Sequence, residues 1–257
     1  MAILSGRGRH SLPDVSEGKT QPVPMEERTS KEYLKVLRIC QGQTGTLRWL
    51  AMKSRPDIEA AVSICASLQT HAPNEAYKYL LEIWKYLATT YGYVMKVEPD
   101  HHETSLVVAT DASFASGGSK SRTGIVISLM GVTVQWVSRK QDLTALSTAE
   151  AELEAMKTGL QYGLQIRRLA GELMEQPVGL KMIGDNMAAI RQAKYEITNW
   201  RTQHYCLTMS WIRDYLIKEC IDLKHVRGEN LVADGLTKIL GKVILARIRD
   251  QLGLEVL

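Results

Sequence analysis

The chain has 257 residues, a length that suits one large domain or, as we expect, two modest ones. Hydrophobic residues make up 45% and charged residues 23%, the ordinary balance of a globular protein. No apolar run approaches the roughly 18 to 20 residues of a membrane-spanning helix. The net charge of +4 is compatible with a polyanionic partner but does not require one.

The cysteines and the first residues favour an intracellular protein. Four cysteines are widely spaced and form no C-x-x-C pair: Cys40, Cys65, Cys206 and Cys220. This spacing argues against a disulfide framework or a zinc site and indicates reduced, buried thiols. The first ten residues also lack the apolar core of a secretory signal.

The first hundred residues change from an aperiodic to a helical pattern. Residues 1–28 are rich in Gly, Pro, Ser and charge, and are predicted to be a flexible leader. Residues 29–100 carry apolar residues at helical spacing, interrupted near Pro56 and Pro73, and Pro56 suits the first position of a helix. This stretch predicts a small helical unit, whose aromatic residues are most simply core residues.

Residues 101–241 show short β-branched runs between longer helical stretches. Strands are expected at 104–111, 123–130, 132–137, 179–183 and 221–226, with Gly131 as a tight turn. Helices are expected at 148–173, from after Asn186 to about 194, at 202–218 and from about Asn230. This order predicts an α/β domain with a mixed five-stranded sheet flanked by helices. Residues 242–257 are expected to form a C-terminal helix.

Two aspartates follow β-rich runs. Asp111 is expected to close the first strand and Asp185 the fourth. Ligands collect at strand ends of α/β sheets, so two carboxylates there suit a metal ion. Either aspartate alone is equally explained by the preference of Asp for turns.

The helix that starts near Thr148 supplies a third acid. Ser147 and Glu150 have the spacing of a capping box, which gives Glu150 a structural task. Glu152 lies about 100° from Leu153 on the helical wheel, at the edge of the apolar stripe, and can face the sheet. Glu154 is interpreted as facing solvent. Glu152 is therefore the better candidate ligand.

A fourth acid, Asp234, is expected early in the last helix, where the helix dipole also favours an aspartate. Asp111, Glu152, Asp185 and Asp234 together form a set of hard oxygen ligands with no Cys or His, which selects Mg²⁺ or Mn²⁺. Clustered carboxylates repel one another unless cations neutralise them.

These acids lie in segments that resemble, in order and spacing, the ribonuclease H domain of copia-type LTR retrotransposon polyproteins. The likeness runs from about Thr104 to Leu240 and rests on five segments: Val107–Ser113, Gln135–Gln141, Leu146–Glu152, Gly184–Asn186 and Leu231–Lys238. It implies a ribonuclease H-like fold. Farther upstream, three segments resemble the reverse transcriptase thumb and connection of the same polyproteins: Pro22–Met25, Gly45–Leu50 and Arg55–Ile58.

The resemblance implies an endonuclease that hydrolyses the RNA strand of an RNA–DNA hybrid with two Mg²⁺ ions, or Mn²⁺, about 4 Å apart. The family's metal ligands fall on Asp111, Glu152, Asp185 and Asp234, with Asp111 bridging both ions. The polymerase motif Tyr-x-Asp-Asp is absent from the sequence. The chain is thus expected to be the tail of a Pol polyprotein or a host gene descended from one, with the upstream reverse transcriptase as a partner, in cytoplasmic particles or the nucleus.

Contacts to the hybrid are expected beside these acids. Ser147, Thr148 and Asn186 are placed to donate hydrogen bonds to the backbone or sugar. Further candidates, each with an ordinary structural explanation as well, are Arg139, Lys140, Arg201 and Arg213 for phosphates and Trp136 and Trp200 for the groove. The family commonly has a basic residue at the position of Gln203. His225 is expected inside the last strand and is interpreted as structural.

Two alternatives use the same fold. A catalytically silent, domesticated nucleic-acid-binding module is expected to have lost some of the four acids, whereas all four are present. A transposase or integrase relative is expected to have a glutamate late in the domain, where this chain has Asp234.

Overall fold

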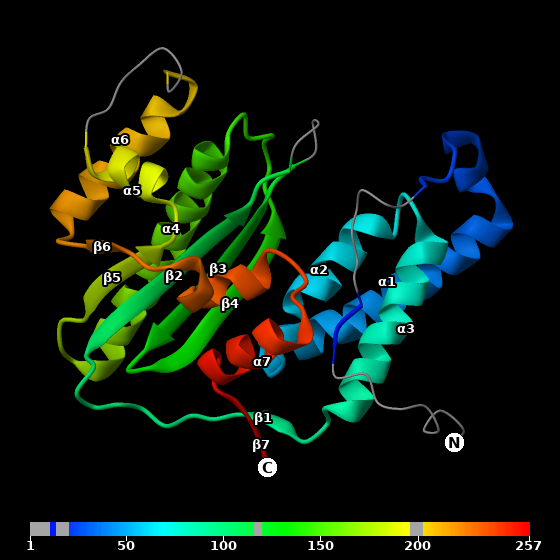
Figure 1. Ribbon diagram of the computed structural model, residues 1–257, viewed down its shortest axis with the longest axis horizontal. Helices are drawn as coiled ribbons and strands as arrows, with labels where there is room; N and C mark the ends of the chain where they lie inside the picture. The colour runs from blue at the N-terminus through cyan, green and yellow to red at the C-terminus, as the bar shows by residue number, and fades with distance from the viewer. Residues whose placement is uncertain (1–10, 14–20, 116–119, 196–202) are drawn as a thin grey trace. The chain divides into compact units, whose positions relative to one another are not determined.

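The computed structural model describes residues 11–13, 21–115, 120–195 and 203–257 (Figure 1). The chain divides into two compact units, which are described separately: residues 1–96 with 238–257, called the helical unit, and residues 97–237, called the sheet unit. Among the described residues, no helix combines the length and the apolar character that crossing a membrane requires.

The helical unit is built from α-helices, short 3-10 helices and one small β-ribbon. Its helices are η2 (Met25–Thr29), α1 (Lys31–Lys53), η3 (Pro56–Ile58), α2 (Glu59–Leu68), α3 (Pro73–Thr89) and α7 (Lys242–Gln251). Pro56 and Pro73 each stand at the first position of their helix, because a proline nitrogen has no hydrogen to leave unpaired there. Strand β1 (Tyr93–Met95) pairs antiparallel with β7 (Leu254–Val256).

Two expected boundaries differ in this unit. Residues 25–28, expected in the flexible leader, belong to η2, and the backbone N–H of Val23 bonds to the carbonyl of His71. The expected C-terminal helix ends at Gln251, and the residues after Gly253 form a strand because they pair with β1. Such long-range pairing leaves no local pattern that the sequence could reveal.

A buried polar network joins the elements of the helical unit. The Arg55 guanidinium donates to both carboxylate oxygens of Asp57, at 2.9 and 2.8 Å, and to the carbonyl and hydroxyl of Thr90. The Tyr86 hydroxyl donates to Asp57 Oδ2 at 2.6 Å, and Arg249 of α7 donates to the Tyr86 oxygen. All five residues are buried, and Asp57 pairs the charge of Arg55 away from water, whereas Nε of Arg249 has no hydrogen-bond partner.

The sheet unit contains the mixed five-stranded sheet that the sequence predicted. The strands are β2 (Ser105–Ser113), β3 (Arg122–Leu129), β4 (Val132–Lys140), β5 (Gly179–Gly184) and β6 (Asp222–His225), in the order β4-β3-β2-β5-β6. Strands β2, β3 and β4 are antiparallel neighbours, whereas β5 is parallel to β2 and β6 is parallel to β5. Met130 and Gly131, with φ of 53° and 77°, form the tight β3–β4 turn, as expected for Gly131.

Helices pack against this sheet (Figure 1). They are α4 (Thr148–Met174), α5 (Met187–Lys194) and α6 (Cys206–Lys218), with short 3-10 helices η4 (Gln203–Tyr205), η5 (Gly228–Asn230) and η6 (Val232–Leu236). Leu153, Met156 and Leu160 of α4 share a buried core with Leu106 and Val108 of β2. This face of α4 is the apolar stripe read from the sequence.

The prediction of a helix starting near Asn230 is wrong. That stretch forms η5 and η6, and an α-helix begins only at Lys242. Gly235 lies within this stretch and Gly241 at its end, and glycine is a poor residue for helix propagation.

The expectation of buried thiols holds for two of the four cysteines. All four are free; Cys40 and Cys65 are buried, Cys206 is half-buried and Cys220 is exposed.

Candidate metal centre

Three of the predicted ligands meet in the sheet unit. Each of Asp111, Glu152 and Asp185 offers a carboxylate oxygen, and these oxygens all lie within 4.8 Å of one another. They come from β2, from α4 and from the residue after β5. Asp111 and Glu152 are buried and Asp185 is half-buried. This is the only such group among the residues that the structure describes.

Strand register explains why the two aspartates meet. In the parallel pair of β2 and β5, Ala109 lies opposite Ile183. Asp111 lies two residues farther along β2 and shares a face with Ala109, and Asp185 is the first residue after β5, two residues beyond Ile183. The expectation that Asp111 closes its strand is wrong, because β2 continues to Ser113 and Asp111 is paired with Gly124 of β3.

The start of α4 places the third acid. The Glu150 N–H donates to Ser147 Oγ at 3.1 Å, and Glu150 Oε2 accepts from the N–H of Leu146 at 2.6 Å. The predicted cap is therefore present, with its second bond made one residue earlier than in the usual capping box. Glu152 is buried, as predicted, whereas Glu154 is half-buried and pairs with Lys157.

The cluster is electrostatically incomplete. Burial, then the charges of Asp111 and Asp185, raise the pKa of Glu152 to about 9, against a hydrogen bond from the backbone of Ala112 that lowers it. Glu152 Oε2 is buried and has no hydrogen-bond partner. A divalent cation fits this donor set, because it would coordinate that oxygen and neutralise the repulsion.

Asp234 stands apart from the tight group. It lies in η6 and is half-buried. Its charge also contributes to raising the pKa of Glu152, so it lies close enough to act on the cluster. The structure therefore brings three of the four acids within mutual ligand distance and the fourth nearby.

Some predicted substrate contacts already have partners. Asn186 caps α5, since its side-chain oxygen accepts from the N–H of Ala189 at 3.0 Å. Thr148 is exposed at the start of α4, beside the capping residue Ser147. Arg139 pairs with Asp142 at 2.7 Å. Their roles toward a substrate stay predictions.

The remaining predicted contacts are dispersed. Arg213 donates to the carbonyl of Gln192 in α5 and to that of Tyr195, the residue after α5. Lys140 and Trp136 are half-buried on β4. Arg201 and Trp200 lie outside the described residues.

His225 ends β6, inside the strand as predicted. Its Nε2 lies 3.0 Å from the backbone carbonyl oxygen of Asp185, although the imidazole is exposed. The hydrogen bond joins the end of β6 to a residue of the acid cluster.

Sequence reasoning missed Thr237. Its hydroxyl donates to Asp111 Oδ2 at 2.5 Å, and the residue is buried. Thr237 lies in the segment Leu231–Lys238 that carried the family resemblance, which was the available signal. Its contact with Asp111, 126 positions away, could not be read from spacing.

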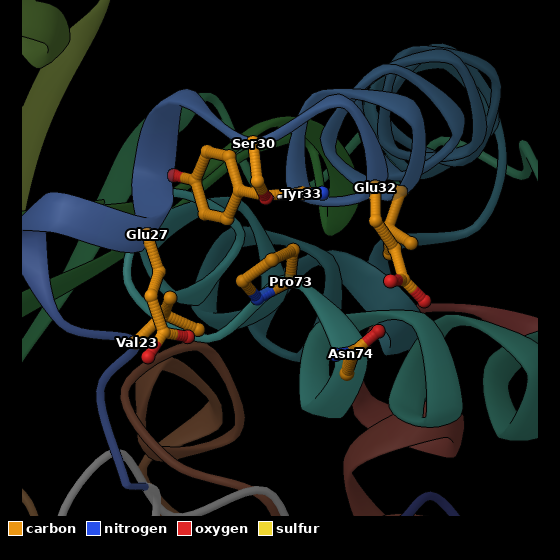
Figure 2. A pocket seen from close by; sticks show the side chains of 8 residues that line it. Val23, Glu27, Ser30, Glu32, Tyr33, Pro73 and Asn74 are labelled. Carbon is orange, nitrogen blue, oxygen red and sulfur yellow. Dashed lines mark hydrogen bonds between the residues drawn. The ribbon is translucent and has the colours of Figure 1, made fainter.

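Two further hollows differ in character from the acid cluster. One, in the helical unit, has a volume of about 140 Å³ and is lined in part by Glu27, Glu32 and Asn74 (Figure 2). The other, in the sheet unit, has about 270 Å³ and is lined in part by Glu150 and His204, which pair at 3.1 Å. Neither contains one of the four predicted acids.

Comparisons with known proteins agree with the resemblance seen in the sequence. No protein family model matches the chain. It is 27% identical over 214 residues to the "Retrovirus-related Pol polyprotein from transposon TNT 1-94" of Nicotiana tabacum, covering 82% of this chain. Matching polyproteins of transposons RE2 and RE1 from Arabidopsis thaliana are each 26% identical and cover 83% of it. The homologues of this chain are copia-type retrotransposon Pol polyproteins.

The polyproteins are much longer than this chain, which spans only 16% of the first and 15% of the other two. Among solved structures, a ribonuclease H1 isolated from compost is 20% identical with a TM-score of 0.41, covering 52% of this chain and 92% of that one. The N-terminal ribonuclease H domain of a Mycobacterium tuberculosis protein is 10% identical with a TM-score of 0.40, covering 57% and 97%. The description of the fold as a mixed five-stranded sheet flanked by helices rests on the strand order of the sheet and not on these matches.

Proposed function

We propose that the sheet unit is a ribonuclease H-type nuclease that hydrolyses the RNA strand of RNA–DNA hybrids with Mg²⁺ ions. The observation that carries this proposal is the cluster of Asp111, Glu152 and Asp185, with one buried carboxylate oxygen left without a partner. The similarity to retrovirus-related Pol polyproteins, whose ribonuclease H domain this sequence resembles, supports the same function.

The donor set suits Mg²⁺ or Mn²⁺, because it consists of hard carboxylate oxygens. When bound, such ions activate the attacking water and stabilise the leaving oxygen. Asp111, Glu152 and Asp185 would hold them, and Asp234 of η6 would complete the set. Deprotonation of Glu152 is expected to accompany binding, since its raised pKa keeps it neutral at pH 7 in the metal-free protein.

The chain's own groups around the cluster would orient the hybrid. Thr148 is exposed at the start of α4, one turn before Glu152, where its hydroxyl can meet a backbone or sugar oxygen. Asn186 follows Asp185 directly and can serve the same purpose through its amide group. An A-like hybrid is recognised by its shape and by the 2′-hydroxyl, so we expect little dependence on base sequence.

A cleavage assay with matched substrates tests the proposal. The full chain is incubated with Mg²⁺ and end-labelled RNA–DNA hybrid, RNA duplex or DNA duplex of one sequence. We expect cleavage of the RNA strand of the hybrid alone. Cleavage of DNA would instead favour the transposase branch, and binding without cleavage would favour the silent module.

Two aspartate variants make the assay specific to the cluster. Asp111→Asn is expected to reduce cleavage by more than about 100-fold, above the loss typical of a residue that only supports a metal ligand. The control Asp222→Asn changes an exposed aspartate of β6 that pairs with Lys224, and should cleave like the wild type. Equal cleavage by Asp111→Asn and the control would remove Asp111 from the site.

A further inference from the structure

The polar contacts of Thr237, the residue after η6, connect two of the predicted metal ligands. The Thr237 hydroxyl lies 2.5 Å from Asp111 Oδ2 and 3.1 Å from the backbone oxygen of Asp234. A hydroxyl has one hydrogen to donate, and the charged carboxylate is the closer and stronger acceptor. One buried side chain therefore touches both the strand that carries Asp111 and the turn that carries Asp234.

Close packing holds η6 in this place. Gly124 of β3 is the antiparallel partner of Asp111, and directly paired residues place their side chains on the same face. A Cβ at Gly124 would lie 2.6 Å from the backbone oxygen of Ala233 and 2.8 Å from Thr237 Cγ2. These distances are too short for any real side chain, so only glycine admits η6 beside Asp111.

We propose that Thr237 is a positioning residue that fixes the rotamer of Asp111 for cation binding and ties it to the segment that carries Asp234. The hydroxyl donates to Oδ2 of Asp111 and so restrains the carboxylate that belongs to the acid cluster. Partners that orient metal-ligating carboxylates in this way contribute about 10- to 100-fold to metal affinity. This inference deepens the proposed function and adds a residue that is not itself a ligand.

Two substitutions separate the hydroxyl from the shape of the side chain. Thr237→Val keeps the volume and removes the donor, whereas Thr237→Ser keeps the donor and removes a methyl group. Thr158→Val is the matched control, because Thr158 is also buried in the sheet unit and its hydroxyl donates to the backbone oxygen of Glu154 rather than to an acid of the cluster. The full chain carries each change.

The first measurement is Mn²⁺ affinity, by calorimetry or electron paramagnetic resonance, in the absence of nucleic acid. Thr237→Val is expected to weaken binding at least about tenfold. Thr237→Ser should stay within about threefold of wild type, and Thr158→Val should match wild type. Wild-type affinity in Thr237→Val, or an equal loss in Thr237→Ser, would overturn the inference.

The second measurement tests the contact without any metal. In EDTA, Thr237→Val should lower the Tm by about 3 °C, because it removes a hydrogen bond to a buried carboxylate. In an Asp111→Ala background the same substitution should cause a smaller loss, since only the bond to the backbone oxygen of Asp234 remains to be removed. Equal shifts in both backgrounds would also overturn the inference.

Hybrid cleavage by the wild type is scored separately from both measurements. Coupling to Asp111 and a tenfold Mn²⁺ effect without cleavage would overturn the proposed function and leave the role of Thr237 standing. Cleavage by the wild type, without coupling to Asp111 and without the Mn²⁺ effect, would support the proposed function and overturn the role of Thr237.

Discussion

The helical unit and the sheet unit each bury an acid, but the surroundings of the two acids are opposite in charge. In the helical unit, both oxygens of Asp57 accept from Arg55, and Tyr86 adds a third hydrogen bond. In the sheet unit, Glu152 is as buried as Asp57, at 4% against 3% exposure, but one of its oxygens has no partner and its neighbours Asp111 and Asp185 are also acids. Buried charges persist when they are paired or bind metal ions, so the Arg55–Asp57 pair is complete, whereas Glu152 stays neutral without metal and requires a cation once it is ionised.

The largest effect that the comparison predicts follows from breaking the buried Arg55–Asp57 pair of the helical unit. Asp57→Asn leaves the Arg55 guanidinium buried without its counter-charge, and should destabilise the helical unit by about 3–5 kcal/mol. Amide hydrogen exchange followed by mass spectrometry would locate the loss of protection in α2 and α3. Asp222→Asn breaks an exposed pair and should cost less than about 1 kcal/mol. Similar costs for the two variants would show that the buried network is not stabilising.

A smaller effect is expected when the incomplete cluster receives its cation. Mg²⁺ at about 100 times its dissociation constant should stabilise the sheet unit by about 2.7 kcal/mol, since a ligand that binds only the folded state adds this much. Chemical denaturation with and without EDTA measures it, and Asp111→Asn should show little of the gain. Equal protection of the helical unit by Mg²⁺ would mean that the ion acts elsewhere.

Per pH unit, the smallest effect concerns the pH dependence of the metal-free protein. The pKa of Glu152 rises from 4.5 to about 9 on folding, so the folded state binds more protons than the unfolded state between these values. This contribution to stability is full below about pH 4.5 and is lost as the pH rises toward 9, by at most about 1.4 kcal/mol per pH unit.

Denaturation midpoints in EDTA from pH 5 to 9 check this slope. Glu152→Gln cannot titrate and should flatten the profile, whereas Glu154→Gln, which changes a half-buried glutamate paired with Lys157, should keep it. A profile unchanged by Glu152→Gln would show that burial does not raise its pKa.

Local patterns predicted much of the sheet unit. The capping pair Ser147 and Glu150 marked the start of α4, and helical spacing then chose Glu152 over its neighbours. Both signals act within one or two turns of chain, where hydrogen bonding and side-chain direction depend on adjacent residues. The β3–β4 turn at Gly131 was readable for the same reason.

Long-range contacts were not readable in this way. The pairing of β1 with β7 joins segments near opposite ends of the chain. The contact between Thr237 and Asp111 depends on how closely η6 approaches Gly124, which no periodicity encodes.

The sequence alone determined which acids are present, which secondary structures carry three of them, and which family they resemble, because these follow from residue type and short-range spacing. Only the tertiary structure decided that Asp111, Glu152 and Asp185 converge while Asp234 stands slightly apart, and that Thr237 bonds to Asp111. Convergence depends on strand register and on the packing of helices against the sheet, which are set by contacts distant in sequence.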